Sequence, residues 1–339
     1  MKRRLKPLIA WSAALIGVGL LSLRLLTPQK ISGVMSAKAQ ATFIISLLDL
    51  FQKTVLTLPF WSALLLTLGL QKLAPAKPQQ KIFGNGFTHD IVWFFYETVL
   101  QTLVIVTYVE LLARLYGKYF SSLTISGIGR WPDWLRFVLA ILVVDFLYWC
   151  QHVCHHKVSF LWRLHAVHHS QSELNFFTDF RYHILEYLVR HTFLVVPLLI
   201  VQINPPVIAL GVIFLKWYTR FYHGNIKTDL GPLRYLLVTP QSHRVHHSIE
   251  TRHGDRNFGA ILSIWDFAFG TQWREYSIYP ETGIADRNFP HQSSGSFGAL
   301  LLSPIRQMIY PFRGTARTTT LSPPVIATRE QPKLNATNS

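Results

Sequence analysis

Long apolar segments separated by short polar ones fill most of the first two thirds of the chain. Several of these segments approach the roughly 20 residues that a helix needs to cross a bilayer. Two prolines cannot continue a helix, so the sequence NPP at 204–206 predicts a tight turn between the last two segments. The predicted spans are residues 7–26, 43–70, 91–112, 135–151, 184–203 and 207–218. The pattern predicts an all-α, multi-span integral membrane helical bundle.

Basic residues around these segments predict how the chain lies in the membrane. The N-terminal sequence MKRRLK favours a cytoplasmic N-terminus under the positive-inside rule. The first apolar run is long and lacks a clean A-x-A site, so we expect an uncleaved helix; a removed signal peptide would lower the helix count by one. Alternating spans then place residues 71–81 inside, 116–134 outside and everything after residue 151 inside.

The composition agrees with a membrane protein and adds little to this prediction. Half of the 339 residues are hydrophobic, and the formal net charge is +16. No basic stripe interleaved with exposed aromatics is visible, so we expect contact with anionic headgroups and no binding of nucleic acid. Two cysteines provide no disulfide framework.

We predict an N-terminal transmembrane scaffold at 1–134, a histidine-bearing catalytic domain at 135–312 and a disordered tail at 313–339, where periodicity is lost.

The candidate chemistry lies in histidines, of which the chain has 15. Eight fall into three clusters whose members are spaced three or four residues apart, which puts them on one side of a helix. Neutral imidazole is a ligand for iron, copper, nickel and zinc. Eight imidazoles would divide into four per metal, and His223 could add a ninth on one of them. The predicted metal ligands are His152, His156, His165, His168, His169, His223, His243, His246 and His247.

Other polar residues could orient these ligands through their free ring N–H groups. Asp145 is a costly charge inside a predicted span, so a functional or paired role is expected. His183 competes with His223 for the ninth position, and Glu186 could orient His183. Asn225 could hydrogen-bond the backbone near His223 or a bound water. We expect structural roles for His89, His155, His191, His253 and His291; Glu173 and Asp179 are further carboxylates near the ligands.

The motifs narrow the metal chemistry. Carboxylate-bridged di-iron bundles use Glu-x-x-His motifs, and the single match, Glu250 to His253, lies outside the clusters. The His-Glu-x-x-His motif of zinc hydrolases is absent, and eight or nine histidines are too many for one zinc. A nitrogen-rich site for two metals fits best. A metal-binding membrane carrier or sensor and a di-zinc membrane hydrolase are the alternatives.

The sequence resembles the fatty acid hydroxylase/sterol desaturase superfamily of membrane di-metal oxygenases. The resemblance rests on His-x3-His at 152–156 and His-x2-His-His at 165–169 and 243–247, with the connecting segments DFLYW, RYHILE, FYHGN and DRNFGAILSIWDFAFGT. It extends from about residue 145 to residue 273. Val153 stands where the family often has arginine, and WDFAFGT lacks the basic residue that commonly follows Trp-Asp.

The resemblance implies an O2-dependent enzyme that hydroxylates or desaturates a C–H bond of a sterol, fatty acyl chain or related lipid. Its implied cofactors are two iron ions, with zinc possible in purified forms. An electron donor such as a cytochrome b5-like protein or a ferredoxin is the implied partner. The di-metal centre is expected in a helical cap on the cytoplasmic face, in a bacterial inner membrane or alternatively in the endoplasmic reticulum.

Overall fold

The computed structural model describes residues 58–100, 106–201, 217–286, 289–290 and 297–312. This part of the chain is helical and contains isolated β-bridges but no strand, which agrees with the predicted all-α class. The predicted span at 7–26 and the predicted tail at 313–339 lie outside the described residues. The principal helices are α3 (Leu58–Leu73), α4 (Asn85–Leu100), α5 (Val106–Leu115), α6 (Asp133–Lys157), α7 (Ser159–His169), α8 (Ile184–Val201), α10 (Pro240–His246), α11 (Ile264–Ala268) and α12 (Phe297–Ile309).

Helix α6 is the clearest membrane-span candidate. Its segment Trp134–Lys157 has 24 residues and a mean hydropathy of 1.8, and among the described helices it is the one long and apolar enough to cross a bilayer. A shorter apolar helix covers Phe60–Leu73. The predicted span at 91–112 corresponds to α4 and α5, which lie on either side of residues outside the description. The predicted segment 184–203 corresponds to α8.

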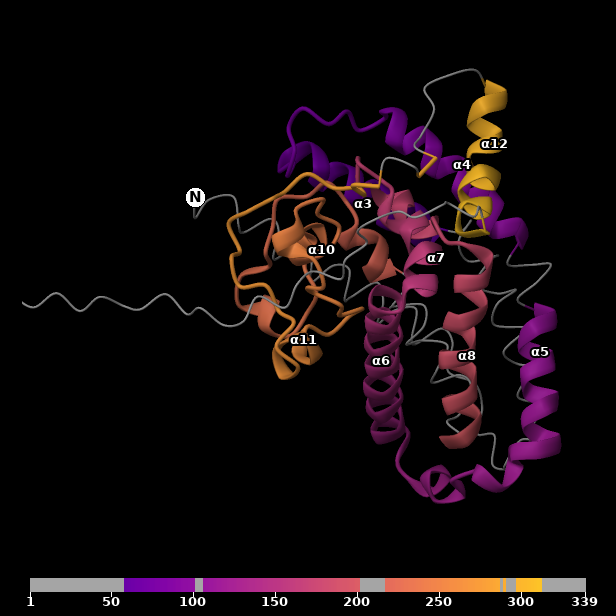
Figure 1. Cartoon of the computed structure of the whole chain (residues 1–339). Helices are drawn as coiled ribbons and strands as arrows, with labels where there is room; N and C mark the ends of the chain where they lie inside the picture. Colours follow the sequence, from indigo (N-terminus) through magenta and orange to yellow (C-terminus); the bar gives the residue numbers. More distant parts are fainter. Residues whose placement is uncertain (1–57, 101–105, 202–216, 287–288, 291–296, 313–339) are drawn as a thin grey trace, which may run out of the picture.

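Three helices, α5, α8 and α6, run alongside one another, with α8 packed against both of its neighbours (Figure 1). Apolar and aromatic side chains from α5 and α8 form one core cluster, in which Val109, Tyr187, Val195 and Leu199 are buried. This packing gives α8 a fixed rotation. Its first turn, which carries Glu186, is thereby held beside α7.

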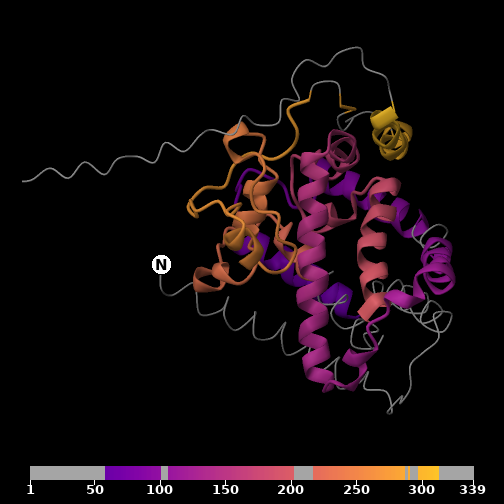
Figure 2. The same cartoon turned by 60° about the horizontal axis from the view of Figure 1, so that its bottom comes forward.

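A sharp break between α6 and α7 positions the first histidines. Val158 adopts an extended conformation (φ −98°, ψ 115°), and its N–H donates to the carbonyl of Cys154 to close α6. Helix α7 begins at the next residue and packs against α6 (Figure 2). The end of α6 and the length of α7 therefore face each other.

Two buried aspartates attach the segment after α10 to α6. Asp145 of α6 accepts hydrogen bonds from the backbone N–H groups of Ile261 and Leu262 and from the Trp265 indole. Asp266 accepts from the N–H groups of Phe258 and Gly259 at 2.8 Å each. A carboxylate that accepts several N–H donors satisfies groups that would otherwise be buried without partners. The loop at 256–262 is fixed against α6 in this way.

Helix α10 is short but firmly capped. Thr239 accepts from the Ser242 N–H, the Ser242 hydroxyl accepts from the Thr239 N–H, and Pro240 occupies the first turn. This capping box fixes where the helix begins and hence the direction of every side chain on it. The start of α10 therefore sets the positions of three predicted ligands, His243, His246 and His247.

Candidate metal centre

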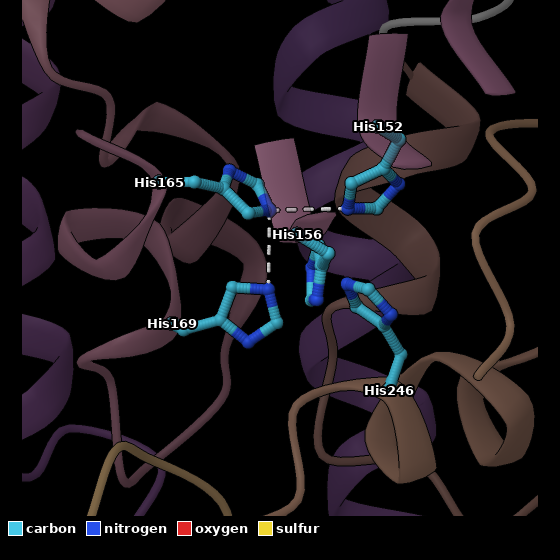
Figure 3. Close-up of side chains that lie close together, drawn as sticks. All are labelled: His152, His156, His165, His169 and His246. Carbon is cyan, nitrogen blue, oxygen red and sulfur yellow. Dashed lines mark hydrogen bonds between the residues drawn. The ribbon is translucent and has the colours of Figure 1, made fainter. Parts of the chain in front are cut away.

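The nine predicted ligands come together in two adjacent groups. In each group, one ligand nitrogen per residue lies within 4.8 Å of the corresponding nitrogens of the other members. Figure 3 shows the rings of the first group turned toward a common centre. The five-histidine group contains His152, His156, His165, His169 and His246, and the four-histidine group contains His168, His223, His243 and His247.

Helices α7 and α10 each contribute to both groups. His165 and His169, four residues apart on α7, belong to the five-histidine group, whereas His168 belongs to the other. On the α10 side, His246 belongs to the five-histidine group, and His243 and His247 belong to the four-histidine group. The equal division predicted for the eight clustered histidines is therefore wrong: they separate five and three. His223 brings the smaller group to four.

Hydrogen bonds behind the rings fix which nitrogen carries the proton. The Nδ1–H of His152 donates to the Phe258 carbonyl at 2.9 Å, and that of His246 donates to the Arg256 carbonyl at 2.8 Å. The Nδ1–H of His223 donates to the Thr219 carbonyl at 2.6 Å. A carbonyl oxygen can only accept, so Nδ1 is protonated and Nε2 is left with a bare lone pair. These rings are thus held in the form that binds a metal.

Glu186 acts in the same way on the five-histidine group. Its Oε1 accepts from the Nδ1–H of His165 at 2.7 Å, and the carboxylate is fully buried. The Nε2 atoms of His165 and His152 then meet at 3.1 Å (Figure 3). With both protons on Nδ1, neither Nε2 has a hydrogen to share, and two lone pairs face each other. A cation among them would turn this repulsion into coordination.

The buried nitrogens that lack partners support the same conclusion. Among the described residues, the Nε2 atoms of His156 and His246 are buried without a hydrogen-bond partner. Both belong to the five-histidine group and reach its centre (Figure 3). A buried nitrogen without a partner costs free energy, which a metal ion would recover. The donor set therefore fits metal ions that accept nitrogen ligands.

Burial keeps these imidazoles neutral. The pKa of His169 lies well below its ordinary value, first because the ring is buried and then because neighbouring imidazoles would repel its charge. The same two causes lower the pKa values of His165 and His243. Burial also lowers the pKa of His223, although the nearby Asp179 carboxylate opposes this. Metal binding needs neutral imidazole. Protons therefore do not compete with a metal ion for these rings near neutral pH.

Of the residues predicted to orient ligands, Glu186 touches one directly, although its partner is His165 rather than His183. Asp145 has the partners expected for a charge inside a span, but its carboxylate accepts from the loop at 261–265 and does not orient an imidazole. His183 caps α8: its Nδ1 accepts from the Leu185 N–H and its Nε2 donates to the Met308 carbonyl.

Asn225 also lies outside the metal groups. Its side-chain oxygen accepts from the Lys77 N–H at 2.9 Å, and its amide donates to the Lys77 carbonyl at 3.0 Å. It therefore ties the segment after α3 to the turn after His223, and the predicted contact with the His223 backbone or a water is replaced by this bridge. Asp179 accepts from the Thr219 hydroxyl at 2.9 Å, which steadies the residue whose carbonyl holds His223.

The remaining histidines lie outside both groups. His155 is fully buried, but its Nδ1–H donates to the Gln151 carbonyl at 2.8 Å on its own helix. His191 donates similarly to the Tyr187 carbonyl, and His253 contacts the Ser248 hydroxyl. His89 is buried. His291 lies outside the described residues.

Several groups at the site were not anticipated. The carbonyls of Arg256 and Phe258 belong to a loop in which Asp255 and Asn257 both have a φ of 57°. Asp and Asn tolerate this left-handed conformation better than other residues with side chains, so the sequence HGDRN at 253–257 carried a signal for a tight turn. Aromatic rings also border the ligands: Tyr182 stacks on His168 with centroids 4.9 Å apart.

A helical fold with nine convergent imidazoles defines a protein with candidate sites for metal ions. Comparison with known proteins adds to this description. Residues 137–271 match the fatty acid hydroxylase family model. The matched region contains all nine histidines of the two groups.

Individual relatives are lipid-modifying enzymes by name. The chain is 33% identical over 171 residues to alkylglycerol monooxygenase of Homo sapiens, covering 47% of this chain and 38% of the relative. It is 32% identical over 143 residues to the ornithine lipid hydroxylase OlsE of Rhizobium tropici, covering 42% and 43%. A Delta(7)-sterol 5(6)-desaturase of Gibberella zeae is 25% identical over 158 residues, covering 46% and 42%. The chain thus spans less than half the length of these relatives, and no solved structure matches it.

Proposed function

We propose that this protein is a membrane-bound oxidoreductase that uses two iron ions, O2 and electrons from a separate donor to hydroxylate or desaturate a lipid. The observation that carries the proposal is the convergence of nine buried or half-buried imidazoles into two adjacent groups. The resemblance to named lipid hydroxylases and monooxygenases supports the lipid as substrate class. The proposed substrate is a sterol, a fatty acyl chain or a related lipid.

The donor set favours a redox metal over a hydrolytic one. Catalytic zinc sites use three protein ligands and keep one position for water, whereas these groups offer five and four imidazoles. Iron accepts such nitrogen-rich, higher-coordinate surroundings. When bound, the two irons would supply the O2-dependent oxidation of an unactivated C–H bond.

The protein's own residues would hold the metals and keep the site dry. Carbonyls behind His152, His223 and His246 keep each proton on Nδ1 and direct Nε2 inward. Glu186 does this for His165 while remaining inaccessible to solvent. These four ligands are thus preorganised, and none of the four has to rotate or lose a proton when the metal binds.

The membrane arrangement is part of the proposal. Helix α6 has the length and hydropathy of a span and carries His152 and His156 near its C-terminal end. Lys157 follows directly, and basic residues favour the cytoplasmic side. We place the histidine groups in a cytoplasmic cap of a multi-span bundle, in a bacterial inner membrane or alternatively in the endoplasmic reticulum. A cytochrome b5-like protein or a ferredoxin would deliver electrons there.

Lipid analysis tests the function. Cells producing the wild-type protein and cells producing His169→Ala are compared, with and without O2, by mass spectrometry of total lipids. We expect a hydroxylated or desaturated lipid that requires both O2 and His169. His89→Ala serves as the control and retains the product. Identical lipid profiles for wild type and His169→Ala under O2 would refute the proposal.

A further inference from the structure

Two short segments on either side of α10 expose large apolar side chains. The first is the 3-10 helix η7 (Gly231–Tyr235) with the residue that follows it, and the second is α11 with the residue that follows it. Four side chains of these segments have exposed fractions between 49% and 56%: Leu233, Tyr235, Leu236 and Phe269. We term these four side chains the η7–α11 surface. Apolar groups that are exposed together, rather than singly, indicate contact with a partner or a membrane.

The two segments are tied to each other. The Ser263 N–H donates to the Leu236 carbonyl at 3.0 Å, and the Ser263 hydroxyl donates to the Arg234 carbonyl at 2.8 Å. The rings of Tyr235 and Phe267 also meet, with centroids 5.7 Å apart. The η7–α11 surface therefore belongs to one structural unit.

This unit is attached to α6 within its apolar stretch. The Phe269 ring stacks on Trp149 with centroids 4.6 Å apart, and the Trp265 ring lies 4.8 Å from Phe146. Figure 1 shows α11 alongside α6, below the level of α10. The candidate span Trp134–Lys157 has 24 residues and is about 36 Å long. The hydrocarbon core of a bilayer is about 30 Å thick, which leaves only about 6 Å of this helix outside it. Phe146 is about 16 Å from the C-terminal end of α6, so it lies inside the core wherever the helix is placed.

The backbone of the two segments is suited to an apolar medium. Backbone N–H groups in the acyl layer need partners within the protein, because no water is there to accept from them. The N–H groups of Leu236 and Leu237 both donate to the Leu233 carbonyl, at 2.9 and 2.8 Å. The Phe269 N–H donates to the Trp265 carbonyl at 2.9 Å. These donors would cost no free energy of desolvation beyond what folding has already spent.

The charges of the two segments are also compensated. Residues 230–237 and 262–270 contain two charged side chains, Arg234 and Asp266. Asp266 is buried and accepts from backbone N–H groups. Arg234 forms an ion pair with Asp229, and its Cζ lies 4.2 Å from the centroid of the Tyr276 ring. Neither residue adds an unpaired charge to the η7–α11 surface.

We propose that the η7–α11 surface is inserted into the acyl layer of the bilayer beside α6, so that the histidine-bearing cap is partly embedded in the membrane. The inference rests on the proposed membrane arrangement, in which α6 is a span. Lipid is the partner because the surface continues directly from the side of α6 that carries Phe146 and Trp149. The loop at 256–262, whose Phe258 carbonyl orients His152, would then be held at the membrane boundary.

Quenching of a fluorescent label tests this in the full-length protein without relying on turnover. Both native cysteines are replaced by alanine, and bimane is attached to Leu236→Cys or, in a separate variant, to Phe269→Cys. The protein is reconstituted into phosphatidylcholine vesicles, and two quenchers are compared: a nitroxide on the lipid acyl chain and iodide in the water. We expect the acyl nitroxide to quench both labels several-fold more than it quenches a label at Ile249→Cys. Ile249 is the matched control, because it is an apolar residue of the same cap that is exposed to 45%. Iodide should show the opposite order.

Two further positions keep the test decisive. Phe269→Cys loses the stacking on Trp149, so a label at Leu233→Cys replaces it if that variant does not fold. A label at Ile141→Cys, half-buried on α6, reports whether α6 itself lies in the bilayer. Lipid quenching at Ile141 without lipid quenching at Leu236 would refute only the present inference.

The outcomes separate the possible surroundings. Quenching of the surface labels by iodide alone would place the surface in water and overturn the inference. Quenching by neither reagent would mean that protein, such as a second copy of this chain, covers the surface, and would overturn it as well. A label at Ile141 that the lipid does not quench would contradict the proposed membrane arrangement. The proposed oxidation is tested apart from this, since an inserted surface requires neither metal nor O2.

Discussion

His223 stands alone in sequence, yet its removal should be as damaging as the loss of a clustered ligand. Without it the second group has three imidazoles, and its Nε2 is the atom that contacts both His243 and His168, at 2.8 and 3.2 Å. We expect His223→Ala to bind about one metal ion per chain. His183→Ala should retain two, since His183 bonds Met308 instead of a metal ligand. Metal analysis checks both variants, and the opposite pattern would reverse the two roles.

Glu186 should control metal affinity without binding the metal. Its removal leaves the Nδ1–H of His165 buried without an acceptor and frees the ring to rotate. Loss of such a partner typically lowers metal affinity about 10–100-fold. We expect this loss for one of the two metals in Glu186→Ala, measured by competition with a chelator. Glu186→Gln, whose amide oxygen can still accept, should lose less. Unchanged affinity in Glu186→Ala would contradict the assignment.

Individual residues differ in how far sequence could predict them. Spacing of three and four residues identified the clustered histidines because helical side chains at that spacing share a face. The spacing could not show which histidine belongs to which of the two groups, because His168 belongs to the four-histidine group and its neighbours His165 and His169 to the five-histidine group. The acceptors at Phe258 and Arg256 are backbone carbonyls, which leave no side-chain signature.

The loop at 256–262 should be as important for stability and metal binding as the helices that carry the ligands. Asp266 is buried and accepts from Phe258, Gly259, the Thr271 hydroxyl and the Trp149 indole. Asp266→Ala leaves these donors unsatisfied and should cost roughly 3 kcal/mol or more of stability. Thr271→Val, which removes one donor, should cost about 1 kcal/mol.

Thermal unfolding in detergent measures this difference. Asp266→Ala should also bind less metal, because Phe258 presents the carbonyl that orients His152. Thr271→Val should bind metal normally. A stable Asp266→Ala protein with two metals would mean that the loop does not depend on this carboxylate.

Apolar pattern predicted the helical class but not the helix ends. Residues 135–151 were predicted as a span, and α6 continues to Lys157, where Val158 breaks the helix. Nothing in the local sequence marks this break, because valine carries no turn signal comparable to proline or glycine. The sequence therefore does not predict the contact between α6 and α7, which brings the first two histidine clusters together.

The whole molecule should have both termini in the cytoplasm. Basic residues precede the first predicted span, and the parity of the predicted spans puts residues after 151 on the same side. A phosphatase reporter fused after Ser339, active only when exported, should be inactive, whereas a cytoplasmic fluorescent reporter at the same position should be bright. An active phosphatase fusion would place the histidine groups on the other face.

Iron content per chain tests the central claim most directly. The claim is that nine imidazoles, divided five and four, hold two metal ions side by side. Protein purified from iron-supplemented cells should contain about two irons per chain by mass spectrometry, and His169→Ala should contain fewer. A wild-type protein with one iron or none after such growth, or a His169→Ala protein that keeps two, would contradict the two-metal centre.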